Sequence, residues 1–234
     1  EEYIADGDEN FEWPSLPDDA ACGLCYTSGT TGNPKGVLYS HKSTILHAIS
    51  AAGPKALKIQ ANDSILMVVP MFHVMAWGVP YYGAIYGIKL VMPGMAMDGA
   101  SLYEMCKQEN VTIAFGVPTV WMQLLGYCRE NNLVLESMES TVIGGSAVTI
   151  AMINEFDQTH GVTVLQRGGM TEMSPLGTTN FPTPEMENMP DDEKYAIQVK
   201  AGRPVFGVEM KIVDSDGNTL PNDGIASGLS LIHI

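Results

Sequence analysis

The chain has 234 residues, of which 45% are hydrophobic and 17% charged, and this composition is typical of a globular protein with a substantial core. Its formal net charge of −15 argues against nucleic acid as a partner, because nucleic-acid binding normally needs a basic face. No apolar run approaches the roughly 20 residues that a membrane-spanning helix needs, so we expect no membrane span.

The N-terminus and the four cysteines bear on location. The chain begins Glu-Glu-Tyr, without a basic or apolar leader, so we expect no signal peptide. Cys22 and Cys25 form a CxxC pair, which can indicate zinc or redox chemistry. However, strand positions three apart face opposite sides, and no second pair stands nearby to complete a zinc site. We therefore favour a reducing compartment and expect a cytoplasmic protein.

Hydrophobic periodicity and turn residues predict strands that alternate with helices, after an acidic connector over residues 1–19. The expected strands cover residues 20–26, 65–69, 89–92, 112–115, 141–143 and 162–166, and we expect the first of them to be buried. The expected helices cover residues 41–52, 73–86, 102–108, 119–130 and 149–159, with Ser40 capping the first and Pro118 starting the fourth. This alternation predicts an α/β fold with mainly parallel sheets flanked by helices, in which ligands bind at the carboxyl ends of the strands.

The last fifty residues break the alternation. Residues 181–194 hold three prolines and five acidic residues and are expected to form an exposed loop. Residues 208–213 alternate like a half-buried strand, and Asp216-Gly217 marks a turn. We expect a more antiparallel, β-rich subdomain to begin near residue 200.

A hydroxyl- and glycine-rich loop follows the first expected strand. It reads Tyr26-Thr27-Ser28-Gly29-Thr30-Thr31-Gly32-Asn33-Pro34-Lys35-Gly36 and holds four serine or threonine hydroxyls, three glycines and one lysine. Glycine lets such a loop turn its N–H groups inward, and inward N–H groups, hydroxyls and an ammonium suit a polyphosphate. A Walker A motif is disfavoured because Gly36, not Ser or Thr, follows Lys35. The alternative is a mobile surface loop. The segment resembles the phosphate-binding signature of the adenylate-forming (AMP-binding) superfamily, which includes acyl-CoA synthetases, luciferases and the adenylation domains of peptide synthetases.

A second segment, Gln166-Arg167-Gly168-Gly169-Met170-Thr171-Glu172, resembles the Gly-Met-Thr-Glu motif of the same superfamily. The resemblance implies that Thr30 and Glu172 hold Mg²⁺, for which a carboxylate is a suitable ligand. Two positions depart from the family pattern. Gly168 stands where an aromatic residue usually packs against the adenine, and Arg167 replaces what is commonly a small residue. We therefore predict a weaker affinity for ATP than an aromatic residue at 168 would give.

Three further segments resemble other parts of the family site. Gly144-Gly145-Ser146-Ala147 resembles the segment that lines the adenine pocket, although Gly-Gly before a helix is common in any α/β protein. Residues 70–78 resemble the segment beside the acyl pocket of fatty acyl-CoA synthetases. There His73 would lie near the reacting carboxylate and Trp77 would gate the acyl tunnel; the alternative is a core histidine and a core tryptophan. Residues 115–121, with Val117 and Pro118, resemble the wall of that pocket.

The resemblance thus implies three groups of site residues. The implied catalytic residues are Lys35, His73, Thr171 and Glu172. The implied nucleotide-binding residues are Thr27, Ser28, Gly29, Thr30, Thr31, Gly32, Lys35, Gly144, Gly145, Ser146, Ala147, Gln166, Gly168, Gly169, Met170 and Thr171. The implied substrate residues are His73, Trp77, Val117 and Pro118.

The implied function is that of an acyl-CoA ligase: a fatty or related carboxylic acid reacts with ATP and Mg²⁺ to an acyl-adenylate, and coenzyme A then displaces AMP. An adenylation domain that loads a carrier protein and a non-catalytic nucleotide-binding module remain open. Family members are roughly twice this length, so residues 20–200 are interpreted as part of the large N-terminal domain and residues 201–234 as a truncated β-rich subdomain. The family's C-terminal lysine-bearing domain has no counterpart, and residues 227–234 leave the expected pattern. We expect this polypeptide alone to be nearly inactive, and the resemblance allows a homodimer of the full-length parent.

Overall fold

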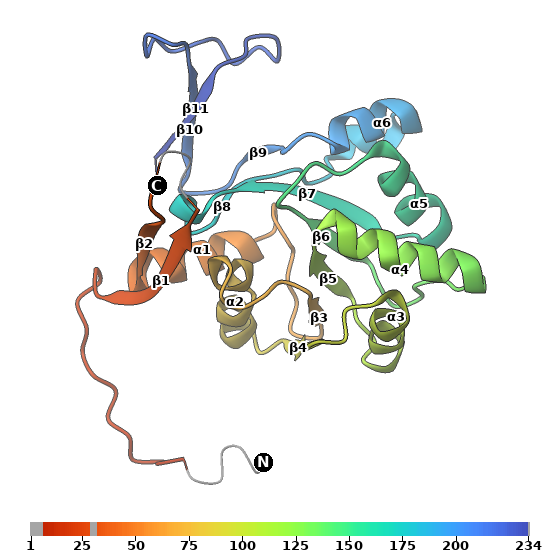
Figure 1. The fold of residues 1–234 in the computed structure, drawn as a ribbon, viewed down its shortest axis with the longest axis horizontal. Helices are drawn as coiled ribbons and strands as arrows, with labels where there is room; N and C mark the ends of the chain where they lie inside the picture. The colour runs from red at the N-terminus through yellow and green to blue at the C-terminus, as the bar shows by residue number, and fades with distance from the viewer. Residues whose placement is uncertain (1–6, 29–31, 234) are drawn as a thin grey trace.

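The computed structural model describes residues 7–28 and 32–233. Within them, seven strands form one sheet in the order β4-β3-β5-β6-β7-β8-β9 (Figure 1). Their bounds are β3 (Ser64–Met67), β4 (Lys89–Val91), β5 (Ile113–Gly116), β6 (Ser140–Ile143), β7 (Thr163–Gly169), β8 (Leu176–Thr179) and β9 (Arg203–Pro204). The strands from β4 to β7 are parallel to one another, whereas β8 pairs antiparallel with both of its neighbours, β7 and β9. The predicted α/β fold with a mainly parallel sheet is confirmed.

Helices cover both faces of this sheet (Figure 1). They are α1 (His41–Ala52), α2 (Val79–Tyr86), α3 (Gly99–Gln108), α4 (Pro118–Asn131), α5 (Ile150–His160) and α6 (Asp191–Gln198). On one face, α1 and α2 pack on alternate strand residues such as Phe115 and Val142. On the other, α3, α4 and α5 bury Trp121 and Phe156 against Ala114 and its neighbours. Neighbouring residues such as Ala114 and Phe115 face opposite sides because successive side chains of a strand point to opposite faces of the sheet.

Helix starts follow the predicted capping residues. The Ser40 hydroxyl accepts a 3.0 Å hydrogen bond from the Ser43 N–H, and the Ser43 hydroxyl accepts one of 3.2 Å from the Ser40 N–H. This reciprocal pair satisfies two backbone donors at the start of α1. Pro118 occupies the first turn of α4, where its missing N–H costs nothing.

The first strand differs from the prediction of a buried strand. β1 (Ala21–Thr27) pairs antiparallel with β2 (Lys35–Ser40) in a separate two-stranded sheet. Its Leu24 and Tyr26 side chains are 54% and 67% exposed. The prediction was wrong because an apolar run shows that a strand forms and does not show what covers it. The hydroxyl-rich loop therefore belongs to a hairpin rather than to the parallel sheet.

The helix expected over residues 73–86 begins later, at Val79. Before it lies a 3-10 turn, η2 (Val74–Gly78), in which φ is positive at Val74, Met75, Ala76 and Trp77, with values of 46, 44, 50 and 55°. A tertiary contact accompanies this left-handed turn. The end of the Met75 side chain lies where a Cβ at Gly23 would be, so a larger residue at position 23 would displace this flexible side chain.

The loop expected over residues 181–194 is also partly helical. Residues of η4 (Pro184–Asn188) and α6 bury Met186 and Tyr195, and the Lys194 ammonium and the Tyr195 hydroxyl each donate to Asp157 over 2.8 Å. Beyond them, β10 (Glu209–Val213) pairs antiparallel with β11 (Leu229–His233), and this hairpin projects away from the main sheet (Figure 1). Within the described residues, no helix is both long and apolar enough to span a bilayer.

Candidate active site

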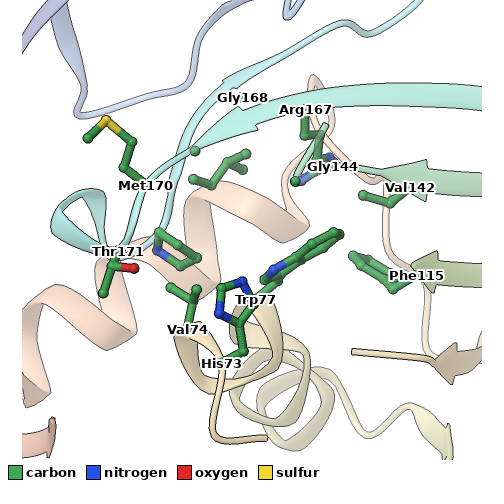
Figure 2. Close-up of a pocket in the computed structure, with 14 residues that line it drawn as sticks. His73, Val74, Trp77, Phe115, Val142, Gly144, Arg167, Gly168, Met170 and Thr171 are labelled. Carbon is green, nitrogen blue, oxygen red and sulfur yellow. The ribbon is translucent and has the colours of Figure 1, made fainter. Parts of the chain in front are cut away.

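A cavity of about 290 Å³ opens at the carboxyl ends of β5, β6 and β7 (Figure 2). Four segments that lie far apart in the sequence form its wall. The lining residues are His73, Val74, Trp77, Phe115, Val142, Gly144, Gly145, Arg167, Gly168, Gly169, Met170, Thr171, Pro175 and Leu176. Ligands of parallel α/β sheets bind at this edge, where the strand ends leave a crevice.

Close backbone approach shapes the cavity. A Cβ at Gly144 would lie 3.1 Å from Cη2 of Trp77, so the indole ring lies directly against this glycine. At Gly145, φ is 78° and a Cβ would lie 3.4 Å from Cγ1 of Val117. The Gly-Gly pair thus lets the aromatic gate predicted at Trp77 reach the loop predicted to hold adenine.

Gln166 supports that loop from beneath. Its side-chain oxygen accepts a 3.1 Å hydrogen bond from the Val148 N–H, and its amide nitrogen donates to the Ser146 carbonyl over 3.4 Å. The side chain is buried and does not line the cavity. Its position suits the holding of Gly144 to Ala147 in place rather than direct contact with a nucleotide.

Tyr39 links the hydroxyl-rich hairpin to the cavity. Its hydroxyl donates to the Thr171 carbonyl, and β1 contacts the short η3 turn (Thr171–Met173). Burial raises the pKa of Tyr39, and the nearby Cys25 and Glu172 add to the rise. The phenol therefore stays protonated and can donate at any physiological pH.

Comparison with known proteins identifies the family. The family model described as AMP-binding enzyme matches residues 2–228. The chain belongs to the AMP-binding enzyme family. It is 50% identical over 228 residues to a medium-chain-fatty-acid–CoA ligase of Ectopseudomonas oleovorans, covering 97% of this chain and 42% of that protein. It is 49% identical over 228 residues to a 3-methylmercaptopropionyl-CoA ligase of Ruegeria pomeroyi, with the same coverage.

Solved structures show the same fold. A long-chain-fatty-acid-CoA ligase from Archaeoglobus fulgidus superposes with a TM-score of 0.82 at 24% identity, over 99% of this chain and 46% of that one. An O-succinylbenzoate coenzyme A synthetase from Bacillus subtilis, in complex with ATP and a magnesium ion, gives a TM-score of 0.73 at 29% identity, over 94% and 43%. The chain therefore spans less than half the length of each of these four relatives.

Of the residues predicted for the nucleotide, acid and metal sites, some line the cavity and others lie outside it. In the cavity wall lie His73, Trp77, Gly144, Gly145, Gly168, Gly169, Met170 and Thr171. Outside it lie Thr27, Ser28, Gly32, Lys35, Val117, Pro118, Ser146, Ala147, Gln166 and Glu172. Gly29, Thr30 and Thr31 lie outside the described residues.

The sequence predicts magnesium ligands at Thr30 and Glu172, and the structure describes only Glu172. Its carboxylate is exposed beside the hairpin, and an accessible carboxylate fits Mg²⁺, which binds through one or two carboxylates and substrate phosphates. Among residues 7–28 and 32–233, no cluster of three or more His, Cys, Asp or Glu forms a metal cage. Such a cage is not needed where phosphates supply most ligands.

Sequence reasoning missed a buried polar group next to this cavity. Arg167 is only 9% exposed, and its Nε and Nη2 atoms have no hydrogen-bond partner, nor do Nε2 of His47 and the Tyr82 hydroxyl. Burial lowers the pKa of Arg167 to about 10, and burial together with the Arg167 charge lowers the pKa of His47 to about 4. The departure of Arg167 from the family pattern was the available signal, but the sequence does not place His47 and Tyr82 beside it.

Proposed function

We propose that the whole protein containing this chain is an acyl-CoA ligase that activates a fatty or related carboxylic acid. One observation carries the proposal: a single cavity is lined by residues predicted for the acid and for adenine and by Thr171, which is predicted to contact phosphate. His73 and Trp77 line it beside Gly144 and Thr171. The names of the relatives, which are CoA ligases at up to 50% identity, support the same reaction class.

The proposed reaction has two steps. A carboxylate oxygen of the acid attacks the α-phosphorus of ATP, the bond from that phosphorus to the bridging oxygen breaks, and pyrophosphate leaves. The thiol of coenzyme A then adds to the acyl carbonyl, loses its proton, and expels AMP to leave a thioester. No covalent bond to the protein forms, so this chain contributes position and charge.

In this proposal, residues at different places around the cavity bind different parts of the substrates. Lys35 lies opposite Thr27 in the hairpin, next to the hydroxyl-rich loop, and in this proposal its ammonium would offset phosphate charge. The Thr171 carbonyl is fixed by Tyr39, which holds the start of η3 against β2. His73 and Trp77 would orient the acid on the other side of the cavity. Magnesium, when bound, would neutralise charge on the phosphates, and Glu172 is the described residue placed to hold it.

Carboxylate-dependent exchange of pyrophosphate into ATP tests the first step in the whole protein. We expect exchange with medium-chain acids, and a loss of at least tenfold in Lys35→Met, since a charge-assisted contact contributes roughly 1.5–3 kcal/mol. Lys55→Met is the matched control, because Lys55 is exposed and lies outside the cavity. Exchange that needs no added acid, or equal loss in both variants, would refute the proposal. Thioester formation with coenzyme A then separates a CoA ligase from a carrier-loading adenylation domain.

A further inference from the structure

The buried guanidinium of Arg167 is the least expected charge in the molecule. Arg167 follows Leu165 by two positions in β7, so its side chain lies on the face of the sheet that carries Phe115 and Val142. Two of its nitrogens are buried without a hydrogen-bond partner. A buried charge without a partner is costly, because desolvation is not offset by any attraction.

The groups around Arg167 supply no negative charge. His47 from α1 and Tyr82 from α2 are its titratable neighbours. Burial lowers the pKa of His47 and raises that of Tyr82, so both are neutral at pH 7. Among the described residues, every ion pair involves other side chains, and no carboxylate lies within 4.0 Å of Arg167. The site therefore carries an uncompensated positive charge.

This charge lies at the edge of the candidate cavity. Arg167 is one of its lining residues, and Figure 2 shows it beside Gly144 and Val142, on the opposite side of the view from Thr171. The phosphate-directed groups, by contrast, are at the Thr171 end, next to the hairpin. Between the two ends, the wall includes Trp77 and Phe115.

We propose that Arg167 forms an anion subsite at the edge of this cavity and that the acid bound there carries a second carboxylate. The inference rests on the proposed function and narrows its substrate class from fatty or related acids to dicarboxylic acids. The reacting carboxylate lies at the Thr171 end, the apolar spacer lies along the aromatic wall, and the second carboxylate meets the guanidinium.

The expected preference arises because the far end of the bound acid is a carboxylate in a dicarboxylic acid and a methyl group in a fatty acid. A terminal carboxylate can accept a charge-assisted hydrogen bond from the guanidinium, and such bonds are the strong ones. A terminal methyl group leaves the guanidinium desolvated and unpaired. Hydrogen bonds to charged groups contribute roughly 1.5–3 kcal/mol, so we expect a preference of about tenfold to a hundredfold for the dicarboxylic acid.

Calorimetric titration of the whole protein with acids matched in carbon number tests the preference for dicarboxylic acids. The pairs are glutarate with valerate, adipate with hexanoate and suberate with octanoate. We expect at least one dicarboxylate to bind at least tenfold more tightly than its partner. Arg167→Met should remove that preference, Arg167→Lys should keep part of it, and Arg129→Met, which removes an exposed arginine, should leave it unchanged.

The outcomes separate this inference from the proposed function. Equal binding of both acids of every pair, no binding of any dicarboxylate, or an unchanged preference in Arg167→Met overturns the inference. Weakened binding of AMP in Arg167→Met, without a change for the dicarboxylates, assigns the subsite to the nucleotide and also overturns it. If dicarboxylate binding depends on Arg167 but no acid supports pyrophosphate exchange, the subsite stands and the ligase proposal fails. Should Arg167→Met not fold, the matched pairs on the unmodified protein still decide.

Discussion

An aromatic residue at position 168, together with a smaller residue at 178, should strengthen ATP binding. Gly168 lies in the cavity wall, where the family pattern has an aromatic residue against the adenine. A Cβ at 168 would lie 2.5 Å from Oγ1 of Thr178 and 3.2 Å from Cβ of Ala201. The glycine therefore fits against a threonine hydroxyl that would obstruct any larger side chain.

The structure indicates the size of the expected loss of stability and of the expected gain in ATP affinity. Gly168→Trp alone overpacks against the buried Thr178 and should destabilise the fold by about 1–3 kcal/mol. Thr178→Ala removes Oγ1 and leaves the Cβ of residue 178 at 3.8 Å, so the remaining close contact is the Cβ of Ala201 at 3.2 Å, which has to move by a few tenths of an ångström. With that small shift the ring of the double variant can stack on the base, and stacking contributes about 1–3 kcal/mol, or about fivefold to a hundredfold in affinity.

Calorimetric titration with ATP and magnesium, together with urea denaturation, measures both effects in the four proteins of a double-mutant cycle. We expect Thr178→Ala alone to leave the affinity unchanged, and the double variant to bind most tightly and to recover stability lost in Gly168→Trp. Because the two positions are in contact, their effects should not add. If the double variant binds ATP no better than Thr178→Ala, the stacking argument is wrong.

Three further predictions concern the core and the metal. As pH falls from 6.5 to 4 the protein should lose about 3 kcal/mol of stability, because burial and the Arg167 charge hold the pKa of His47 down to about 4 in the folded state only. In urea denaturation at a series of pH values, His47→Gln should lack this loss of stability. The same pH dependence in the variant as in the unmodified protein would contradict the role of His47. Glu172→Gln should weaken ATP binding by about tenfold with magnesium and leave it unchanged with a chelator, whereas equal loss in both conditions argues against a metal ligand. Trp121→Ala should cost about 3–5 kcal/mol in urea denaturation, since the ring is fully buried edge-to-face against Phe156, and a loss below that of Trp121→Phe would refute the packing argument.

Elements specified by local chemistry could be predicted from the sequence. The start of α1 follows from Ser40 and Ser43, which cap it without help from the rest of the chain. The clustering of Gly144 with Gly169 follows from topology, because both come after strands of one parallel sheet. These features depend on neighbours in sequence or on a rule of sheet architecture.

Features set by distant contacts could not be predicted. The exposure of Tyr26 depends on which residues cover β1, and the apolar pattern of the strand does not contain that information. The helical turns around Met186 and Tyr195 lie in a polar, proline-rich segment, and their apolar side chains reach the core through tertiary packing. The environment of Arg167 depends on α1 and α2, which lie 120 and 85 positions away at His47 and Tyr82.

The left-handed turn before α2 has a consequence for the indole of Trp77. L-amino acids in a left-handed conformation cost roughly 1–2 kcal/mol each, and four stand in succession from Val74 to Trp77. A D-alanine at Ala76, introduced by chemical ligation, would adopt the observed φ of 50° with less strain than the natural residue. The Trp77 indole is thus held in place by its packing against the surrounding residues, including Gly144, and not by the preference of its own backbone, so its position reports on the integrity of the surrounding domain.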